Sequence, residues 1–274
     1  MTEALSAEAV KSLGSPLACV VELHDALRST QERARELAHA GARHGTLVVS
    51  RVQTGGRGRL GRRWGSPEGG LWMSLVLRPA FDAALAARIT QTASVGVAKA
   101  LWEIGIEARI KWPNDLLVDG KKICGILAES SAESAPVAAK RVAPGENVRR
   151  LDFVILGIGM NANLDPADLA VPDREVATIR AELGRDVDLL ELLKTILTDL
   201  ETELDRIEDF DAVLDDWRAL NCTLGNRVRV RRFGETLEGV AVDLNPEGAL
   251  LLKTRDGTVE LYEGEIEQLR QDGT

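Results

Sequence analysis

The sequence has few of the residues that mark disulfide-rich or zinc-binding proteins. It holds three cysteines and three histidines in 274 residues. The cysteines, Cys19, Cys124 and Cys222, are far apart and form no Cys-x-x-Cys pair. This spacing excludes a disulfide framework and a zinc site and favours reduced thiols. The histidines all lie in the first fifth of the chain and show no metal-ligand spacing.

Long apolar runs and an excess of positive charge are also absent. No run approaches the roughly 18 residues of a membrane helix, and the start, Met-Thr-Glu-Ala, lacks the basic and apolar segments of a signal peptide. We therefore expect a cytoplasmic protein with no membrane partner. The formal net charge is −9, so the chain offers no general basic face for phosphate contacts and no DNA partner is expected.

The most unusual stretch, which we call the Gly/Arg loop, runs from Gln53 to Trp64 and reads Gln-Thr-Gly-Gly-Arg-Gly-Arg-Leu-Gly-Arg-Arg-Trp. Its glycines disfavour a regular helix or strand, while its arginines and exposed amides suit a phosphate or carboxylate. We interpret it as a loop that closes over an anionic small molecule. Composition alone also allows a disordered linker or a nucleic-acid arm. The string Gly-x-Gly-x-x-Gly within it is rejected as a dinucleotide fingerprint, because no helix can follow.

Apolar periodicity predicts an α/β (α+β) protein, with an expected domain over 1–220 and a second over 221–274. In the second part, four or five short strands with tight turns predict a small barrel. A helix over 88–104 would place Trp102 in or near the core. Residues 130–150 are expected to form a surface loop. The other predicted helices cover 30–40, 178–184, 189–207 and 210–220. Strands are predicted over 18–23, 46–52, 70–79, 107–112 and 151–163, and a hairpin with an Asp119-Gly120 turn is predicted over 116–129.

Several polar residues adjoin these predicted elements. Ser29 or Thr30 can cap the helix that begins near residue 30, either as a cap only or as a cap that also contacts a ligand. Lys111 ends a strand beside a rigid Trp-Pro turn, where it is either a solvated lysine or a fixed cation for a bound anion. Gly157 and Gly159 indicate close approach of a ligand or another backbone.

In this order, these segments resemble the biotin protein ligases. The matching segments are Ser29-Thr30, Gln53 to Trp64, Lys111-Trp-Pro-Asn-Asp115, Gly125-Ile-Leu-Ala-Glu129, Gly157-Ile-Gly-Met-Asn161 and the terminal barrel. The resemblance implies a central mixed β-sheet backed by helices, followed by an SH3-like barrel. It also implies that biotin and ATP form biotinyl-5′-adenylate, which then acylates a lysine of a biotin carboxyl carrier protein.

The resemblance also assigns residues. Ser29, Thr30, Gln31, Gln53, Arg57, Gly58, Arg59 and Lys111 are expected to bind biotin, and Arg57, Arg59 and Lys111 to act in catalysis. Gly56, Arg59, Arg62, Trp64 and Asn161 are expected to bind ATP, with Asn161 at the adenine. Magnesium is expected to be held mainly by the ATP phosphates, with no protein metal site.

One position departs from the family pattern, and the segment before the first predicted ligase strand is short. The family usually has Asn after Ser-Thr, where this chain has Gln31. Only some twenty residues precede the first predicted ligase strand, which implies a ligase without the N-terminal DNA-binding domain of some members. A lipoate ligase of the same fold and a non-enzymatic anion- or nucleic-acid-binding module stay as alternatives. The sequence leaves open whether the protein is a monomer or a homodimer.

Overall fold

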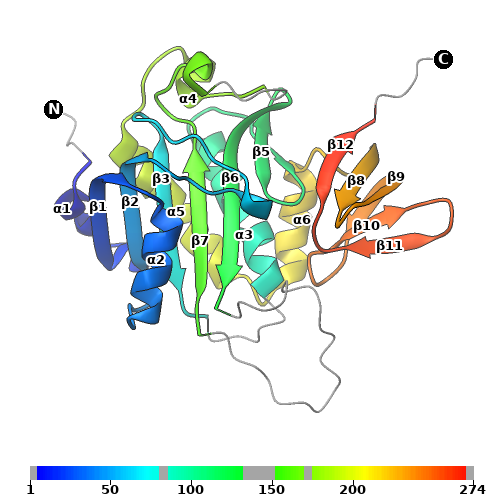
Figure 1. Ribbon diagram of the computed structural model, residues 1–274, viewed down its shortest axis with the longest axis horizontal. Coiled ribbons are helices and arrows are strands. Elements are labelled where there is room, and N and C mark those ends of the chain that lie inside the picture. Colours follow the sequence, from blue (N-terminus) through cyan, green and yellow to red (C-terminus); the bar gives the residue numbers. More distant parts are fainter. Residues whose placement is uncertain (1–4, 80–85, 132–151, 170–174, 270–274) are drawn as a thin grey trace.

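The computed structural model describes residues 5–79, 86–131, 152–169 and 175–269. The chain forms two β-sheets, the first from its N-terminal part and the second from its C-terminal part. The helices pack around the first sheet (Figure 1). The prediction of a loop over 130–150 falls almost entirely outside the described residues. Nearly every other predicted element is present, with ends shifted by a few residues. The helices are α1 Ala7–Ser12, α2 Thr30–His39, α3 Ala86–Glu103, α4 Ile179–Leu183, α5 Leu189–Asp205 and α6 Phe210–Leu220.

The first sheet has seven strands in the order β1-β2-β3-β7-β6-β5-β4. The β1–β2 pair is parallel and every other neighbouring pair is antiparallel. The predicted central mixed sheet backed by helices is therefore confirmed. Its strands are β1 Val20–Leu27, β2 Thr46–Gln53, β3 Leu71–Leu77, β4 Arg109–Lys111, β5 Asp115–Val118, β6 Lys121–Ser130 and β7 Val154–Met160.

Helices cover both faces of this sheet, which explains why β3 is buried along its whole length (Figure 1). On one face, α2 packs Ala34 and Ala38 against Val48, Val76 and Phe153. On the other face, α3, α5 and α6 build the main core, which includes the fully buried Trp112 and Trp217. Ser29 caps α2, because its side chain accepts a hydrogen bond from the Glu32 amide.

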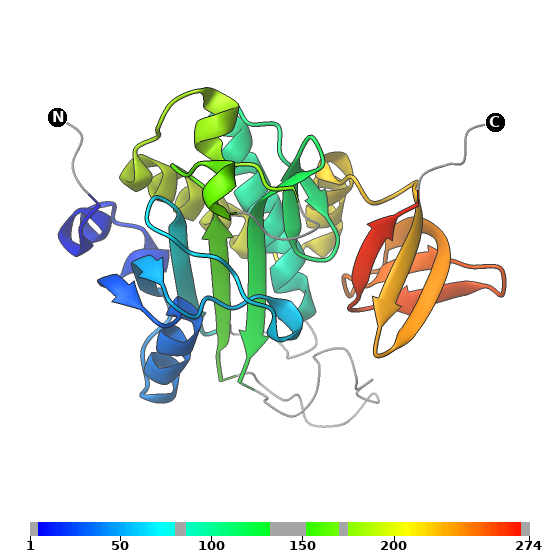
Figure 2. The ribbon, with the colours of Figure 1, turned by 45° about the horizontal axis from the view of Figure 1, so that its top comes forward.

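The second sheet is antiparallel, in the order β11-β10-β9-β8-β12, and Figure 2 shows it as a separate body beyond α6. It forms the predicted barrel-like module, and its last strand lies toward the first sheet. The Trp112 amide donates to Thr223 Oγ1 at 2.9 Å, which ties the start of this module to the turn after β4. The strands are β8 Arg227–Arg232, β9 Glu235–Leu244, β10 Leu250–Lys253, β11 Thr258–Leu261 and β12 Glu265–Gln268.

Two local predictions have opposite outcomes. The Asp119-Gly120 hairpin turn is confirmed: both residues have positive φ, 48° and 79°, as a type I′ turn requires. The placement of Trp102 in the core is wrong. Its side chain is 40% exposed, the Arg109 guanidinium stacks on its ring, and its Nε1 donates to the Ala108 carbonyl.

The helical layer contains an acidic group that disfavours the folded state near neutral pH. Burial, with help from Glu103 and Glu203, raises the pKa of Asp199 from 3.8 to about 6. The folded chain therefore binds this proton more tightly than the unfolded chain. The contribution of Asp199 to the free energy of unfolding consequently falls as pH rises from about 4 to 6. Above pH 6 the destabilisation by the Asp199 charge has reached its full size.

Asp199→Asn removes this charge and is expected to stabilise the protein by about 1 kcal/mol at pH 7.5, after allowance for the partial exposure of the carboxylate. At pH 4 the two proteins should have nearly equal stability, because the carboxyl is then protonated in the folded state. Urea unfolding at the two pH values measures the difference. Equal gains at both pH values would show that packing, rather than charge, is responsible.

Candidate active site

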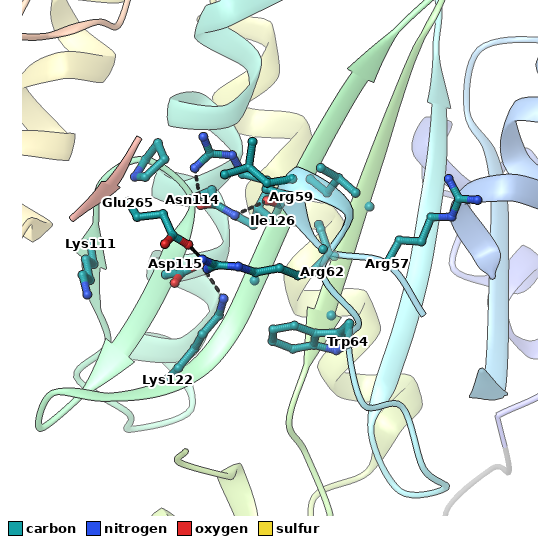
Figure 3. Close-up of a pocket in the computed structure, with 18 of the residues that line it drawn as sticks. Arg57, Arg59, Arg62, Trp64, Lys111, Asn114, Asp115, Lys122, Ile126 and Glu265 are labelled. Carbon is teal, nitrogen blue, oxygen red and sulfur yellow. Dashed lines mark hydrogen bonds and ion pairs between the residues drawn. The ribbon is translucent and has the colours of Figure 1, made fainter. Parts of the chain in front are cut away.

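A cavity of about 640 Å³ opens between the first sheet, the Gly/Arg loop and strand β12 of the second sheet. The structure brings together at this cavity every predicted site residue except Gly56 and Asn161. The lining residues come from distant parts of the chain, as Figure 3 shows for ten labelled side chains. The predicted residues that line it are Ser29, Thr30, Gln31, Gln53, Arg57, Gly58, Arg59, Arg62, Trp64 and Lys111.

One end of the cavity, which we call the polar end, is built from Thr30, Gln53 and Ser74. The Thr30 amide donates to Gln53 Oε1 at 2.8 Å, and Gln53 Nε2 donates to Ser66 Oγ at 2.8 Å. The Thr30 hydroxyl lies 2.9 Å from the Ser74 hydroxyl and 3.1 Å from Gln53 Oε1. The N-terminus of α2 is thereby joined to the beginning of the Gly/Arg loop.

Gln31 lies behind the polar end and is almost fully buried. Its Nε2 donates to Glu129 Oε2 at 2.8 Å and to the Ile155 carbonyl at 3.2 Å. A Cβ atom at Gly157 would lie 2.4 Å from Gln31 Oε1, so the predicted close approach at Gly157 is made by this side chain. The Gln31 side chain therefore binds protein groups on both sides of its amide.

The Gly/Arg loop crosses the mouth of the cavity and is folded onto neighbouring elements. Arg59 Nη1 donates to Asn114 Oδ1 at 3.1 Å, and Arg57 pairs with Glu32 at the start of α2. Arg57 consequently points away from the other labelled cations in Figure 3. Burial lowers the pKa of Arg59 below its usual range, with Asp115 acting in the opposite direction. Arginine stays protonated in proteins, so Arg59 presents a partly desolvated charge.

Trp64 lies across strands β6 and β7 and forms one wall of the cavity. Cβ atoms at Gly125 and Gly159 would lie 3.0 Å and 2.6 Å from its indole. The approach predicted at Gly159 is thus made by Trp64. The indole also stands edge-on to Trp72, with ring centroids 6.5 Å apart. Only glycine at these strand positions lets the indole lie flat on the sheet.

Gly159→Ala is therefore expected to displace Trp64 and weaken binding of the ligand at this wall by about tenfold or more. Titration calorimetry with biotin and with ATP measures the effect. Gly65→Ala is the matched control, because its Cβ would lie 4.0 Å from the nearest atom. Unchanged affinities in Gly159→Ala would mean that the Trp64 wall takes no part in binding.

Lys122 is a site residue that the sequence analysis missed. Its ammonium lies 2.5 Å from Asp115 Oδ1 and 4.8 Å from the centroid of the Trp64 ring, inside the cavity (Figure 3). Alternation along the hairpin was the available signal, since Lys121 and Lys122 point to opposite faces. Lys111 lies on the far side of the cavity from the Gly/Arg loop. Within the described residues, no carboxylate lies within ion-pair distance of Lys111.

The second sheet supplies part of the wall through Arg231 and residues 264–268. Arg62 of the Gly/Arg loop forms an ion pair with Glu265 at the start of β12, which joins the two parts of the protein across the cavity (Figure 3). The barrel is therefore a structural part of the site.

Two predicted residues lie elsewhere. Asn161 is 2% exposed, and its Nδ2 donates to the carbonyls of Lys122 and Ala177. The structure does not bring it to the cavity, so an adenine contact by this side chain stays a prediction. Gly56 lines a second hollow, on the outer side of the Gly/Arg loop. A Cβ atom at Gly56 would lie 2.5 Å from the Trp64 carbonyl oxygen.

Comparisons with known proteins agree with this arrangement. Residues 23–141 match the biotin/lipoate A/B protein ligase family, and residues 223–268 match the biotin protein ligase C terminal domain. The chain is 38% identical over 252 residues to the bifunctional ligase/repressor BirA of Bacillus subtilis, covering 89% of this chain and 72% of BirA. It is 32% identical over 246 residues to a biotin--[acetyl-CoA-carboxylase] ligase of Paracoccus denitrificans, covering 87% and 96% of the two chains.

The fold has a close solved relative. The structure of a biotin protein ligase from Aquifex aeolicus in complex with biotin and ATP matches with a TM-score of 0.72 and 30% identity, covering 92% of this chain and 99% of that chain. The fold and the cavity thus define the class of biotin and lipoate protein ligases. Within this class, the chain belongs to the biotin protein ligase family.

No helix among the described residues is both long and apolar enough to cross a membrane. The described residues also contain no group of three or more His, Cys, Asp or Glu side chains placed to hold a metal ion. All three cysteines are free thiols.

Proposed function

We propose that this protein attaches biotin, through biotinyl-5′-adenylate, to a lysine of a biotin carboxyl carrier domain, with conversion of ATP to AMP and pyrophosphate. The observation that carries this proposal is the shared cavity, which has hydrogen-bonding groups at one end and fixed cations at the other. Biotin has the same order of groups: a ureido ring, an apolar chain and a carboxylate. Met73, Ile126 and Ile158 line the cavity as apolar surface for the chain.

Positioning and charge account for the first step. The carboxylate of biotin attacks the α-phosphorus of ATP, an O–P bond forms, and pyrophosphate leaves with the electron pair of the broken bond. Both reactants are anions, so cations must offset their repulsion and the charge that develops on phosphorus. Lys111, Lys122 and Arg59 are the proposed cations, together with Arg57, which is paired with Glu32 in this structure. In the second step the carrier amine attacks the acyl carbon, AMP leaves, and no protein nucleophile is needed.

The Gly/Arg loop is proposed to retain the adenylate between the two steps. A mixed anhydride is hydrolysed readily, so a loop that excludes water protects it. Arg59, held by Asn114, and Arg62, held by Glu265, both fasten the loop over the cavity. The barrel would then contribute to retention of the adenylate as well as to the cavity wall.

Magnesium is proposed to arrive with the ATP phosphates, where it would offset their negative charge. Asp115 is the carboxylate on the sheet side of the cavity, and one of its oxygens pairs with Lys122. One carboxylate with a free oxygen fits a magnesium ion that keeps most of its ligands from phosphate and water. A cytoplasmic location, where ATP is available and thiols stay reduced, completes the proposal.

The experiment incubates the protein with ATP, magnesium, labelled biotin and an apo-carrier domain, with lipoate as the parallel acid. Label should appear on the carrier domain with biotin, and mutation of the acceptor lysine should abolish it. Labelling with lipoate alone would favour the lipoate ligase alternative. Absence of labelling with both acids, from folded protein, would contradict the proposal.

A further inference from the structure

The polar end of the cavity contains more hydroxyl contacts than hydroxyl protons. The Thr30 hydroxyl lies 2.9 Å from Ser74 Oγ and 3.1 Å from Gln53 Oε1, and Ser74 Oγ lies 3.1 Å from Gln31 Oε1. Each hydroxyl has a single proton, so two protons serve three contacts. The neighbouring groups determine which contact lacks a proton.

The orientation of the Gln31 amide is fixed by what surrounds it. Its nitrogen faces acceptors only: Glu129 Oε2 and the carbonyls of Ile155 and Leu127. Arg35 holds the Glu129 carboxylate in place through a contact of 2.6 Å. Reversing the amide would set its oxygen against a carboxylate and two carbonyls inside the protein, which is strongly unfavourable. Gln31 Oε1 must therefore face Ser74 as an acceptor.

This orientation fixes the direction of the next two hydrogen bonds. Ser74, fully buried on β3, donates its proton to Gln31 Oε1 and can only accept from Thr30. Thr30 then donates along the shorter of its two contacts, toward Ser74. Gln53 Oε1 loses little, because it already accepts the Thr30 amide proton at 2.8 Å. The opposite choice would leave two buried hydroxyl oxygens in contact at 2.9 Å without a proton between them.

We infer that Gln31 and Ser74 are positioning residues that fix Thr30 Oγ1 as a hydrogen-bond acceptor, so that the polar end selects a ligand by an N–H donor. With its proton directed at Ser74, Thr30 Oγ1 presents a lone pair beside Gln53 Oε1, 3.1 Å away. An N–H group placed between these oxygens satisfies both, whereas a ring oxygen or sulfur meets two lone pairs. This inference rests on the proposed function and specifies how the same cavity distinguishes a ureido acid from other ring acids.

The test uses biotin and its two cyclic carbamate analogues, in which one ureido N–H or the other is replaced by oxygen. Titration calorimetry gives a discrimination ratio, defined as the dissociation constant of the weaker-binding carbamate divided by that of biotin. The wild-type ratio is expected to exceed about tenfold, because a buried site built for a donor rejects an analogue that lacks it. In Ser74→Ala the Thr30 proton is released, and the ratio should fall by about tenfold.

A second variant tests the same hydrogen-bond direction by a different substitution. Gln31→Met keeps the side-chain length but removes the acceptor, so the Ser74 proton turns to Thr30 and the same fall in ratio is expected. Ser94→Ala is the control, since Ser94 is a buried serine on α3 that bonds to the Thr90 carbonyl and lies outside the cavity. A general loss of structure would weaken biotin and carbamate alike and leave the ratio unchanged.

The outcomes separate this inference from the proposed function. A ratio that falls in both Ser74→Ala and Gln31→Met, but not in Ser94→Ala, supports the inference. A wild-type ratio near one, or ratios within about twofold of wild type in both variants, overturns it while biotin binding itself persists. If the wild-type protein binds neither biotin nor the carbamates, the proposed function is what fails.

Discussion

Lys122→Met is expected to slow biotin-dependent pyrophosphate release by about 10²–10³-fold, the cost of removing one preorganised charge from a developing anion. The ammonium lies in the cavity over the Trp64 ring and is only 17% exposed, so its charge is weakly screened. Methionine keeps most of the apolar stem and removes only the charge. Pyrophosphate release at saturating biotin and ATP, measured without carrier, reports the step directly.

Lys121→Met is the matched control, because Lys121 is the exposed neighbour of Lys122 in the same hairpin. Lys111→Ala, on the other wall of the cavity, is expected to show a loss of similar size if both cations act on the reacting groups. Turnover of Lys122→Met close to that of Lys121→Met would remove Lys122 from the proposed mechanism. Turnover of Lys111→Ala close to that of Lys121→Met would likewise remove Lys111 from the proposed mechanism.

Arg59→Gly is expected to speed dissociation of biotinyl-5′-adenylate by about 10- to 100-fold, which is the size of one hydrogen bond to a charged group. The substitution removes the contact with Asn114 and adds backbone freedom to the Gly/Arg loop. Released adenylate acylates exposed lysines, so proteins other than the carrier should become biotinylated. Dissociation can be followed by dilution of the preformed complex into excess unlabelled biotin and ATP.

Arg185→Gly is a suitable control for Arg59→Gly, since Arg185 is an exposed residue that does not line the cavity. The adenylate dissociation rate should change only in Arg59→Gly. An unchanged rate in that variant would refute the proposed role of the loop in retaining the intermediate, whatever its effect on the first step.

Local patterns in the sequence predicted most of the fold and several of the residues that meet at the cavity. The Gly/Arg loop and Lys111 stand out because glycine density and a strand-ending lysine before Trp-Pro are local signals. The Asp119-Gly120 turn was predicted for the same reason, since its chemistry depends on two adjacent residues.

Features that depend on pairing between distant segments could not be predicted. Lys122 meets Asp115 through the register of β5 and β6, which has an irregularity between Leu116 and Leu117. Ser74 is a lone serine in an otherwise apolar strand, a signal that was present but has no meaning until Thr30 and Gln31 are placed beside it. The contacts of Trp64 with β6 and β7 likewise exist only in the folded sheet.

Pyrophosphate release from ATP on addition of biotin, with no carrier protein present and lipoate as the parallel acid, tests the central claim most directly. Biotin alone should trigger release, because the cavity is proposed to assemble biotin carboxylate, ATP and the fixed cations without the carrier. Release with lipoate but not biotin, or with neither acid from folded protein, would contradict the assignment of this cavity to biotin activation.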